Sequence, residues 1–105
     1  MPMTIIVTRN VAPRFRGFLA SVMLEIAPGV YTQPRMSKGV RERVWSVLAA
    51  WFEVGATTGG HPDDQASIVM TWLDRDAAGG QAIETLGVPA KRLVDADGVV
   101  LVQRL

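Results

Sequence analysis

The sequence contains no cysteine and a single histidine, His61. Without cysteine there can be no disulfide bond, thiolate nucleophile or thiolate metal site. No apolar run reaches the roughly 18 residues that a membrane-spanning helix needs. The start, Met-Pro-Met-Thr, leads into a strand-like segment without the basic region of a signal peptide. We therefore expect a cytoplasmic protein that does not associate with membranes.

The sequence also lacks a convincing set of metal ligands. His61 lies in a Gly-Gly-His-Pro-Asp-Asp segment and could bind a divalent cation together with Asp63 and Asp64. A polar loop explains this cluster more simply. Two further carboxylate pairs are typical of turns between strands: Asp74 with Asp76, and Asp95 with Asp97. We therefore predict no metal site, no cofactor and no catalytic residue.

The size and charge of the chain suggest one domain with an anionic partner. Its 105 residues are 49% hydrophobic and 20% charged, as in a globular domain spanning residues 1–105. Residues 1–43 carry seven basic and two acidic side chains, whereas residues 44–105 carry four basic and eight acidic ones. This asymmetry favours an anionic partner for the first half of the chain.

The stretch from Thr4 to Gly17 combines a strand with the start of a helix. Its β-branched run is followed by Thr-Arg-Asn, and Pro13 then suits the first turn of an amphipathic helix. Arg14 and Arg16 fall in that first turn, where backbone N–H groups and the helix dipole favour an anion. Both side chains are expected to face solvent. Phosphate contact and a solvated helix start remain equal alternatives at this point.

The remaining pattern predicts an α+β fold. A turn at Pro28-Gly29 joins two short strands, and Ser37 caps a helix over residues 38–54 that Gly55 ends in a left-handed conformation. Further strands are predicted at 67–73, 81–86 and 99–105, with Lys91 and Arg92 in a loop. The order is βαββαβ, as in a ferredoxin-like domain, with two extra C-terminal strands over about 81–105.

Several apolar and basic residues allow two interpretations. Trp51 and Trp72 could stack on bases, but their positions favour the core, and the same applies to Met23, Met36 and Met70 as gap fillers. The run from Val99 to Val102 is too apolar for an exposed edge, so it either folds back on its own sheet or pairs with another chain. Lys91 and Arg92 fit either a phosphate contact or a solvated loop.

The first 45 residues carry a specific resemblance. The pattern Met-x-Met-x-Ile-x-Val-Thr-x-Asn-Val-x-Pro-Arg-x-Arg-Gly, followed by Gly29-Val-Tyr31, Ser37, Arg41-Glu42 and Trp45, resembles CRISPR-associated protein 2 of the type I-E subfamily. The resemblance implies a ferredoxin-like homodimer that bridges two dimers of the integrase CRISPR-associated protein 1. That assembly captures double-stranded DNA and inserts it into a CRISPR array as a spacer.

The resemblance also implies site residues. In the family, the counterparts of Asn10, Arg14, Arg16, Lys91 and Arg92 contact the phosphate backbone of the captured duplex. The last strand helps to bind the integrase.

One position departs from the family pattern. The family is commonly described as a magnesium-dependent endonuclease, yet Arg9 stands where the subfamily usually carries a glutamate. A guanidinium cannot bind magnesium. Two hypotheses follow: a largely non-catalytic DNA scaffold for spacer acquisition in antiviral defence, which Arg9 favours, and a magnesium-dependent nuclease acting on RNA or duplex DNA.

Overall fold

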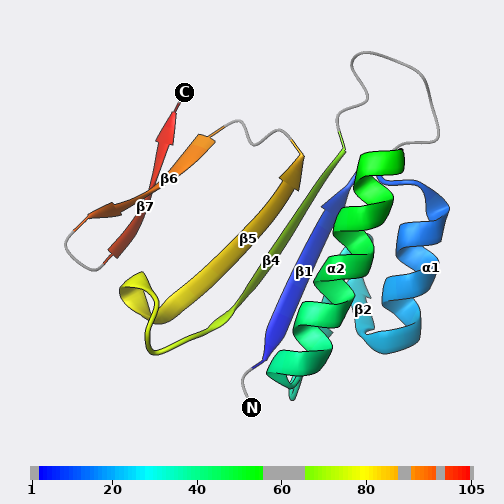
Figure 1. Cartoon of the computed structure of the whole chain (residues 1–105), viewed down its shortest axis with the longest axis horizontal. Helices are drawn as coiled ribbons and strands as arrows, with labels where there is room; N and C mark the ends of the chain where they lie inside the picture. Colours follow the sequence, from blue (N-terminus) through cyan, green and yellow to red (C-terminus); the bar gives the residue numbers. More distant parts are fainter. Residues whose placement is uncertain (1–2, 56–65, 88–90, 97–98, 105) are drawn as a thin grey trace.

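The computed structural model describes residues 3–55, 66–87, 91–96 and 99–104 (Figure 1). In these ranges the chain forms, in order, β1 (Thr4–Arg9), α1 (Pro13–Val22), β2 (Leu24–Ala27), β3 (Val30–Gln33), α2 (Lys38–Val54), β4 (Ser67–Leu73), the 3-10 turn η1 (Ala78–Gly80), β5 (Gln81–Gly87), β6 (Lys91–Ala96) and β7 (Val99–Arg104). The predicted βαββαβ order is confirmed from β1 to β4. Three strands follow it instead of two, because β6 forms where the sequence predicted a loop.

The first five strands form one antiparallel sheet in the order β2-β3-β1-β4-β5. Strand β1 lies at its centre, where Ile6 is opposite Tyr31 of β3 on one side and Met70 of β4 on the other. This antiparallel order, with its two helices, is the ferredoxin-like arrangement that the sequence predicted. Among the described residues, strands β6 and β7 pair only with each other, and β7 lies next to η1 on the β5 side of the sheet (Figure 1).

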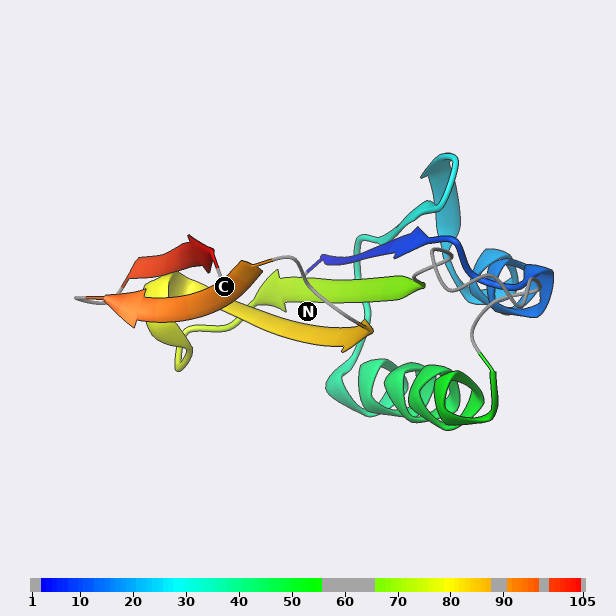
Figure 2. The ribbon, with the colours of Figure 1, turned by 90° about the horizontal axis from the view of Figure 1, so that it is seen from above.

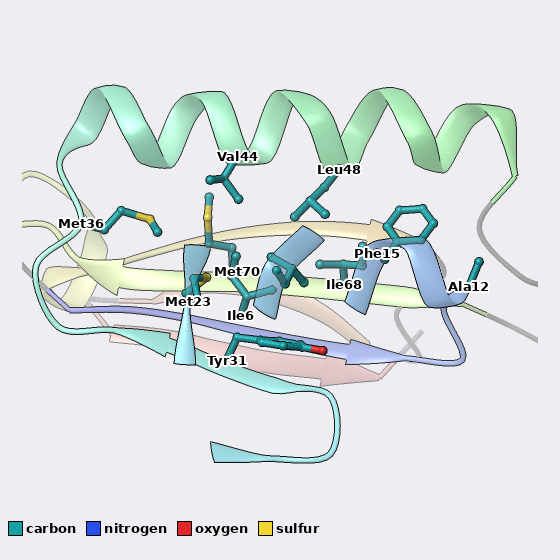
Figure 3. Packing of buried hydrophobic residues seen from close by; sticks show 11 residues of the cluster. Ile6, Ala12, Phe15, Met23, Tyr31, Met36, Val44, Leu48, Ile68 and Met70 are labelled. Atoms are coloured by element: carbon teal, nitrogen blue, oxygen red, sulfur yellow. The ribbon is translucent and has the colours of Figure 1, made fainter. Parts of the chain in front are cut away.

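The core lies between the sheet and the two helices. Strand residues alternate in direction, so Ile6, Ile68 and Met70 point toward α2, which contributes Val44 and Leu48 (Figure 3). Other buried side chains of this cluster are Phe15, Leu19, Met23, Tyr31 and Met36. Met23, Met36 and Met70 therefore fill gaps in the core, as predicted.

The two ends of α2 differ in how well the sequence predicted them. Ser37 caps the helix as predicted, because its Oγ accepts a hydrogen bond of 3.2 Å from the Val40 N–H. Gly55 follows the last helical residue, but its φ of 166° is extended backbone rather than the predicted left-handed conformation. Its carbonyl group is instead bound by an arginine from α1, as described below.

The face of the sheet opposite the helices is left partly exposed. Val7 of β1, Leu73 of β4 and Leu24 of β2 are exposed by 42%, 66% and 67%. In Figure 2, α2 lies on one side of the sheet only. Large apolar side chains at strand positions are normally covered.

Within the described ranges, neither helix is long and apolar enough to cross a membrane.

Candidate nucleic-acid interface

The carboxyl end of β1 gathers several of the predicted site residues. We use the term β1 corner for Thr8, Arg9, Asn10, Arg14 and Arg16, which surround the connection from β1 to α1. Asn10 has a φ of 56°, a left-handed conformation that asparagine adopts more readily than most residues. This sharp turn brings the first turn of α1 back beside the strand. The β1 corner therefore results from local chain geometry.

The turn between β2 and β3 packs against this corner. The backbone N–H and Oγ1 of Thr8 both donate to the Gly29 carbonyl, at 2.7 and 3.1 Å. Gly29 has a φ of +76°, and a Cβ at this position would lie only 2.8 Å from the Thr8 carbonyl oxygen. Only glycine fits both constraints. A shallow cavity of about 280 Å³ opens here between Thr8, Asn10, Arg16 and Gly29.

Arg16 is exposed, as predicted, but it is paired within the protein. Its Nη2 lies 3.6 Å from Oε2 of Glu25, which also accepts a hydrogen bond of 3.1 Å from the Gly29 N–H. The pKa of Glu25 is lowered, first by this backbone N–H, then by Tyr31 and Arg16. The hydroxyl of Tyr31 is buried beside the pair, and this burial raises the pKa of Tyr31. Any anion that binds Arg16 competes with Glu25.

Arg14 is also exposed, but it acts as a cap for another helix. Its Nη2 donates to the carbonyl oxygen of Gly55 and lies 3.4 Å from that of Trp51. Its guanidinium lies 5.2 Å from the centroid of the Phe15 ring. A cation is favourable at a helix C-terminus, where the last carbonyl groups lack backbone donors. This role could not be predicted from the sequence, because nothing in the spacing reveals that α2 ends beside α1.

Arg9 is exposed at the carboxyl end of β1, the central strand, and lies in one row with residues of two neighbouring strands. The register places Arg9 opposite Ser67 of β4, and Ser67 opposite Gly87 of β5. These two inter-strand steps span about 10 Å. The carboxyl end of β5 therefore lies at the same end of the sheet as the β1 corner.

Lys91 and Arg92 begin β6 rather than lying in a loop, so that prediction was wrong. The preference of Leu93 and Val94 for strands outweighed the turn residues on either side. Lys91 can lie no farther than about 14 Å from Gly87 along the backbone, so β6 begins near the end of the sheet where Arg9 lies. Their side chains lie outside the described part of the structure, as does His61 with Asp63 and Asp64.

The other cations of the first half lie at the opposite end of the sheet. Gln33 at the end of β3 pairs with Thr4 at the start of β1, and Arg35 and Lys38 follow it. The charge asymmetry in the sequence therefore does not produce one continuous basic surface. It produces two separate groups, of which only the β1 corner adjoins Asn10.

Most of the remaining candidates that the structure describes lie in a turn or at the core. Oδ1 of Asp74 accepts a hydrogen bond of 3.0 Å from the Asp76 N–H, which is a turn contact, as predicted. Asp95 lies within β6 rather than in the predicted turn, so that prediction was wrong, and Asp97 lies outside the described residues. No cluster of three or more potential metal ligands occurs in the described ranges. Trp51 packs edge-on against Phe15, with ring centroids 5.7 Å apart, which confirms its predicted place at the core.

Trp72 packs against the same cluster, as predicted, but it also contacts a charged group. The Arg41 guanidinium lies 4.2 Å from the centroid of its ring. No role of Arg41 was predicted from the sequence. Its position four residues after Ser37 gave no sign that it would be buried at the start of α2.

The fold and the β1 corner define a class: a small ferredoxin-like α+β protein with arginine side chains at the end of its first strand. The family model described as CRISPR-associated protein (Cas_Cas2CT1978) matches residues 3–101. The chain belongs to this family, the CRISPR-associated protein 2 family, which confirms the resemblance seen in the sequence. Assignment to type I-E stays a prediction.

Proposed function

We propose that the chain is a homodimeric, largely non-catalytic scaffold for spacer acquisition, which holds a DNA duplex and bridges two dimers of the CRISPR-associated protein 1 integrase. Family membership supports a role in a CRISPR system. The observation that carries the proposal is the placement of Arg9, Arg14 and Arg16 together at the carboxyl end of β1, close to the start of β6. Asn10, Lys91 and Arg92 complete the proposed contact surface.

Contacts of this kind hold the duplex through its phosphates without reading its bases. Arg9 supplies the most accessible charge, because its side chain is exposed and no ion pair to it occurs within the described residues. Arg16 contributes by exchanging Glu25 for a phosphate. Arg14 remains bound to the end of α2 and contributes mainly to the local positive potential.

The proposed dimer uses the exposed face of the sheet. Met3, Ile5 and Leu73 border a shallow apolar cavity of about 430 Å³ near η1. Val7 is exposed on the same face, since it alternates with the buried Ile6. A second copy of the chain would cover these side chains and place two β1 corners in one assembly.

The DNA contacts can be tested by titrating a fluorescent duplex with the assembled complex at several salt concentrations. Arg9→Ala and Arg16→Ala should each reduce the magnitude of the logarithmic salt slope by about 0.9 for every phosphate that the variant no longer neutralises. Arg43→Ala is the matched control, because Arg43 is exposed on α2, outside the β1 corner. If both β1 corner variants keep the wild-type slope while correctly folded, the DNA path lies on another surface.

The dimer can be tested by light scattering at micromolar concentrations. Val7→Asp should give a monomer, because it places a charge on the exposed sheet face, whereas Val54→Asp should remain dimeric. Val54 is 85% exposed at the end of α2, which makes it a matched control. A monomeric wild type would contradict the dimer, and failure to co-purify with the integrase of the same locus would contradict the bridging role.

The nuclease alternative predicts cleavage of RNA or duplex DNA in the presence of magnesium. The proposed scaffold should leave both intact, because Arg9 replaces the family's proposed magnesium ligand. Cleavage that co-elutes with the protein and is lost in Asn10→Ala would overturn the non-catalytic part of the proposal.

A further inference from the structure

A second polar site lies at the other end of the sheet, at the start of α2. Two adjoining cavities, of about 730 and 460 Å³, share the side chains of Lys38, Arg41, Trp72 and Asp74. We call their combined space the Arg41 cleft. Trp72 pairs with Thr4 at the beginning of β1, so this cleft lies far from the β1 corner.

Arg41 is an unusual residue to find in such a place. It is only 8% exposed, yet its side chain makes no ion pair or hydrogen bond with any residue in the described ranges. One face of its guanidinium stacks on Trp72 at 4.2 Å. Stacking stabilises the charge but uses none of its N–H donors. The Arg41 nitrogens are not among the fully enclosed polar atoms of the described residues, so their N–H donors open onto the cleft, where a ligand can reach them.

We propose that the Arg41 cleft binds the carboxylate of an aspartate or glutamate side chain on a protein partner. A planar guanidinium held against an aromatic ring presents its donors in a fixed fork, which matches the two oxygens of a carboxylate. The stack with Trp72 fixes the guanidinium plane before the ligand arrives. Met36 and Trp45 line the same cavities and offer apolar contacts to the aliphatic part of that side chain.

The charges around the cleft favour a peptide over a nucleic acid. Four carboxylates line it, from Glu42, Asp74, Asp76 and Glu84, and they outnumber the three cations of its lining, Lys38, Arg41 and Arg75. Lys38 lies 4.0 Å from Glu42 and offsets part of that charge. These carboxylates would repel the successive phosphates of a nucleic acid, but they would attract lysine or arginine residues that flank a single acidic side chain. The expected ligand is therefore one acidic residue within a basic peptide.

The site can be tested by NMR with the full-length, ¹⁵N-labelled protein. The probe is a blocked peptide, Lys-Leu-Glu-Leu-Lys, and its control replaces the glutamate by glutamine. Titration with the glutamate peptide should shift the Nε–H signal of Arg41 and the indole N–H signal of Trp72 saturably. The glutamine peptide should bind about tenfold more weakly, because it lacks the charge of the acceptor.

Two variants assign the effect to the proposed residue. Arg41→Lys keeps the charge but loses the planar fork, so the Trp72 shift should require about tenfold more peptide. Arg43→Lys, on the exposed side of the same helix, should bind as the wild type does. The comparison of the two peptides on wild-type protein is decisive even if Arg41→Lys fails to fold.

Three results would overturn the proposal. Equal binding of the two peptides would mean that the carboxylate is not recognised, and no shift with either would leave Arg41 a purely structural residue. A shift of the Arg41 signal by duplex DNA, but not by the glutamate peptide, would make the cleft a nucleic-acid contact. None of these results depends on the β1 corner, so they are separate from the test of the proposed function.

Discussion

The Arg14→Ala variant tests whether α1 and α2 are joined by a helix cap. The guanidinium of Arg14 binds the carbonyl group of Gly55 and lies close to that of Trp51. A net hydrogen bond contributes about 0.5–1.5 kcal/mol, and a cation at an exposed helix C-terminus contributes about 0.3–1 kcal/mol. Because Arg14 is exposed, the lower parts of these ranges apply, and the loss should be about 1 kcal/mol.

The assay is thermal unfolding of the variants at equal protomer concentration, with urea unfolding as a second measurement. For a chain of this size, 1 kcal/mol corresponds to a decrease in Tm of about 4 °C. Arg14→Lys should lose about half as much, since it keeps the charge at the end of α2 without the fork of donors. Arg43→Ala should change the free energy of unfolding by less than about 0.5 kcal/mol, because Arg43 is an exposed helix residue outside these contacts.

A stabilising helix cap by Arg14 would be refuted if Arg14→Ala and Arg43→Ala unfolded at the same temperature. In that case the hydrogen bond to Gly55 would contribute nothing to stability. Arg14 would then be available to DNA without any cost to the fold, as the sequence alone suggested.

Three further predictions concern the turn and the helix starts. Gly29→Ala should destabilise the protein by about 2 kcal/mol or more, because of its positive φ and its close approach to Thr8, whereas Gly17→Ala, with open space around it, should be neutral or stabilising in chemical unfolding. Ser37→Ala should cost about 1 kcal/mol in the same assay, because it removes the cap of α2. Because the pKa of Glu25 is lowered in the folded state, its contribution to stability is present above its unfolded pKa and is lost as pH falls through its folded pKa. Glu25→Gln should therefore weaken the pH dependence of unfolding below about pH 4.5. An unchanged pH profile would contradict the pairing of Glu25 with Arg16.

The sequence predicted best those elements whose signals are local. Ser37, the turn at Gly29 and the apolar period of α2 all depend on residues within a few positions, and all three predictions are confirmed. The prediction for Lys91 failed for the same reason. Acidic and glycine residues on either side outweighed, in a local reading, the strand-forming positions of β6 itself.

The candidate site was predicted in its position but not in its contacts. That Arg14 and Arg16 would be exposed at the end of β1 followed from the strand and helix pattern. Their partners did not, because Glu25 and Gly55 lie farther along the chain and meet them only through the packing of β2 and α2. The burial of Arg41 could not be predicted either, since it depends on contact with Trp72, which lies far along the chain.

The separate pairing of β6 and β7 has a consequence for dissecting the protein. The strand pairing of the five-stranded sheet ends at Gly87, and in the part of the chain that the structure describes the last two strands pair with no earlier strand. A chain cut after Gly87 would keep the whole five-stranded sheet and give up the hairpin together with its packing against η1. Exchange of the hairpin for that of a relative should therefore leave the pairing of the five-stranded sheet unchanged, which would separate the contribution of the hairpin from that of the sheet.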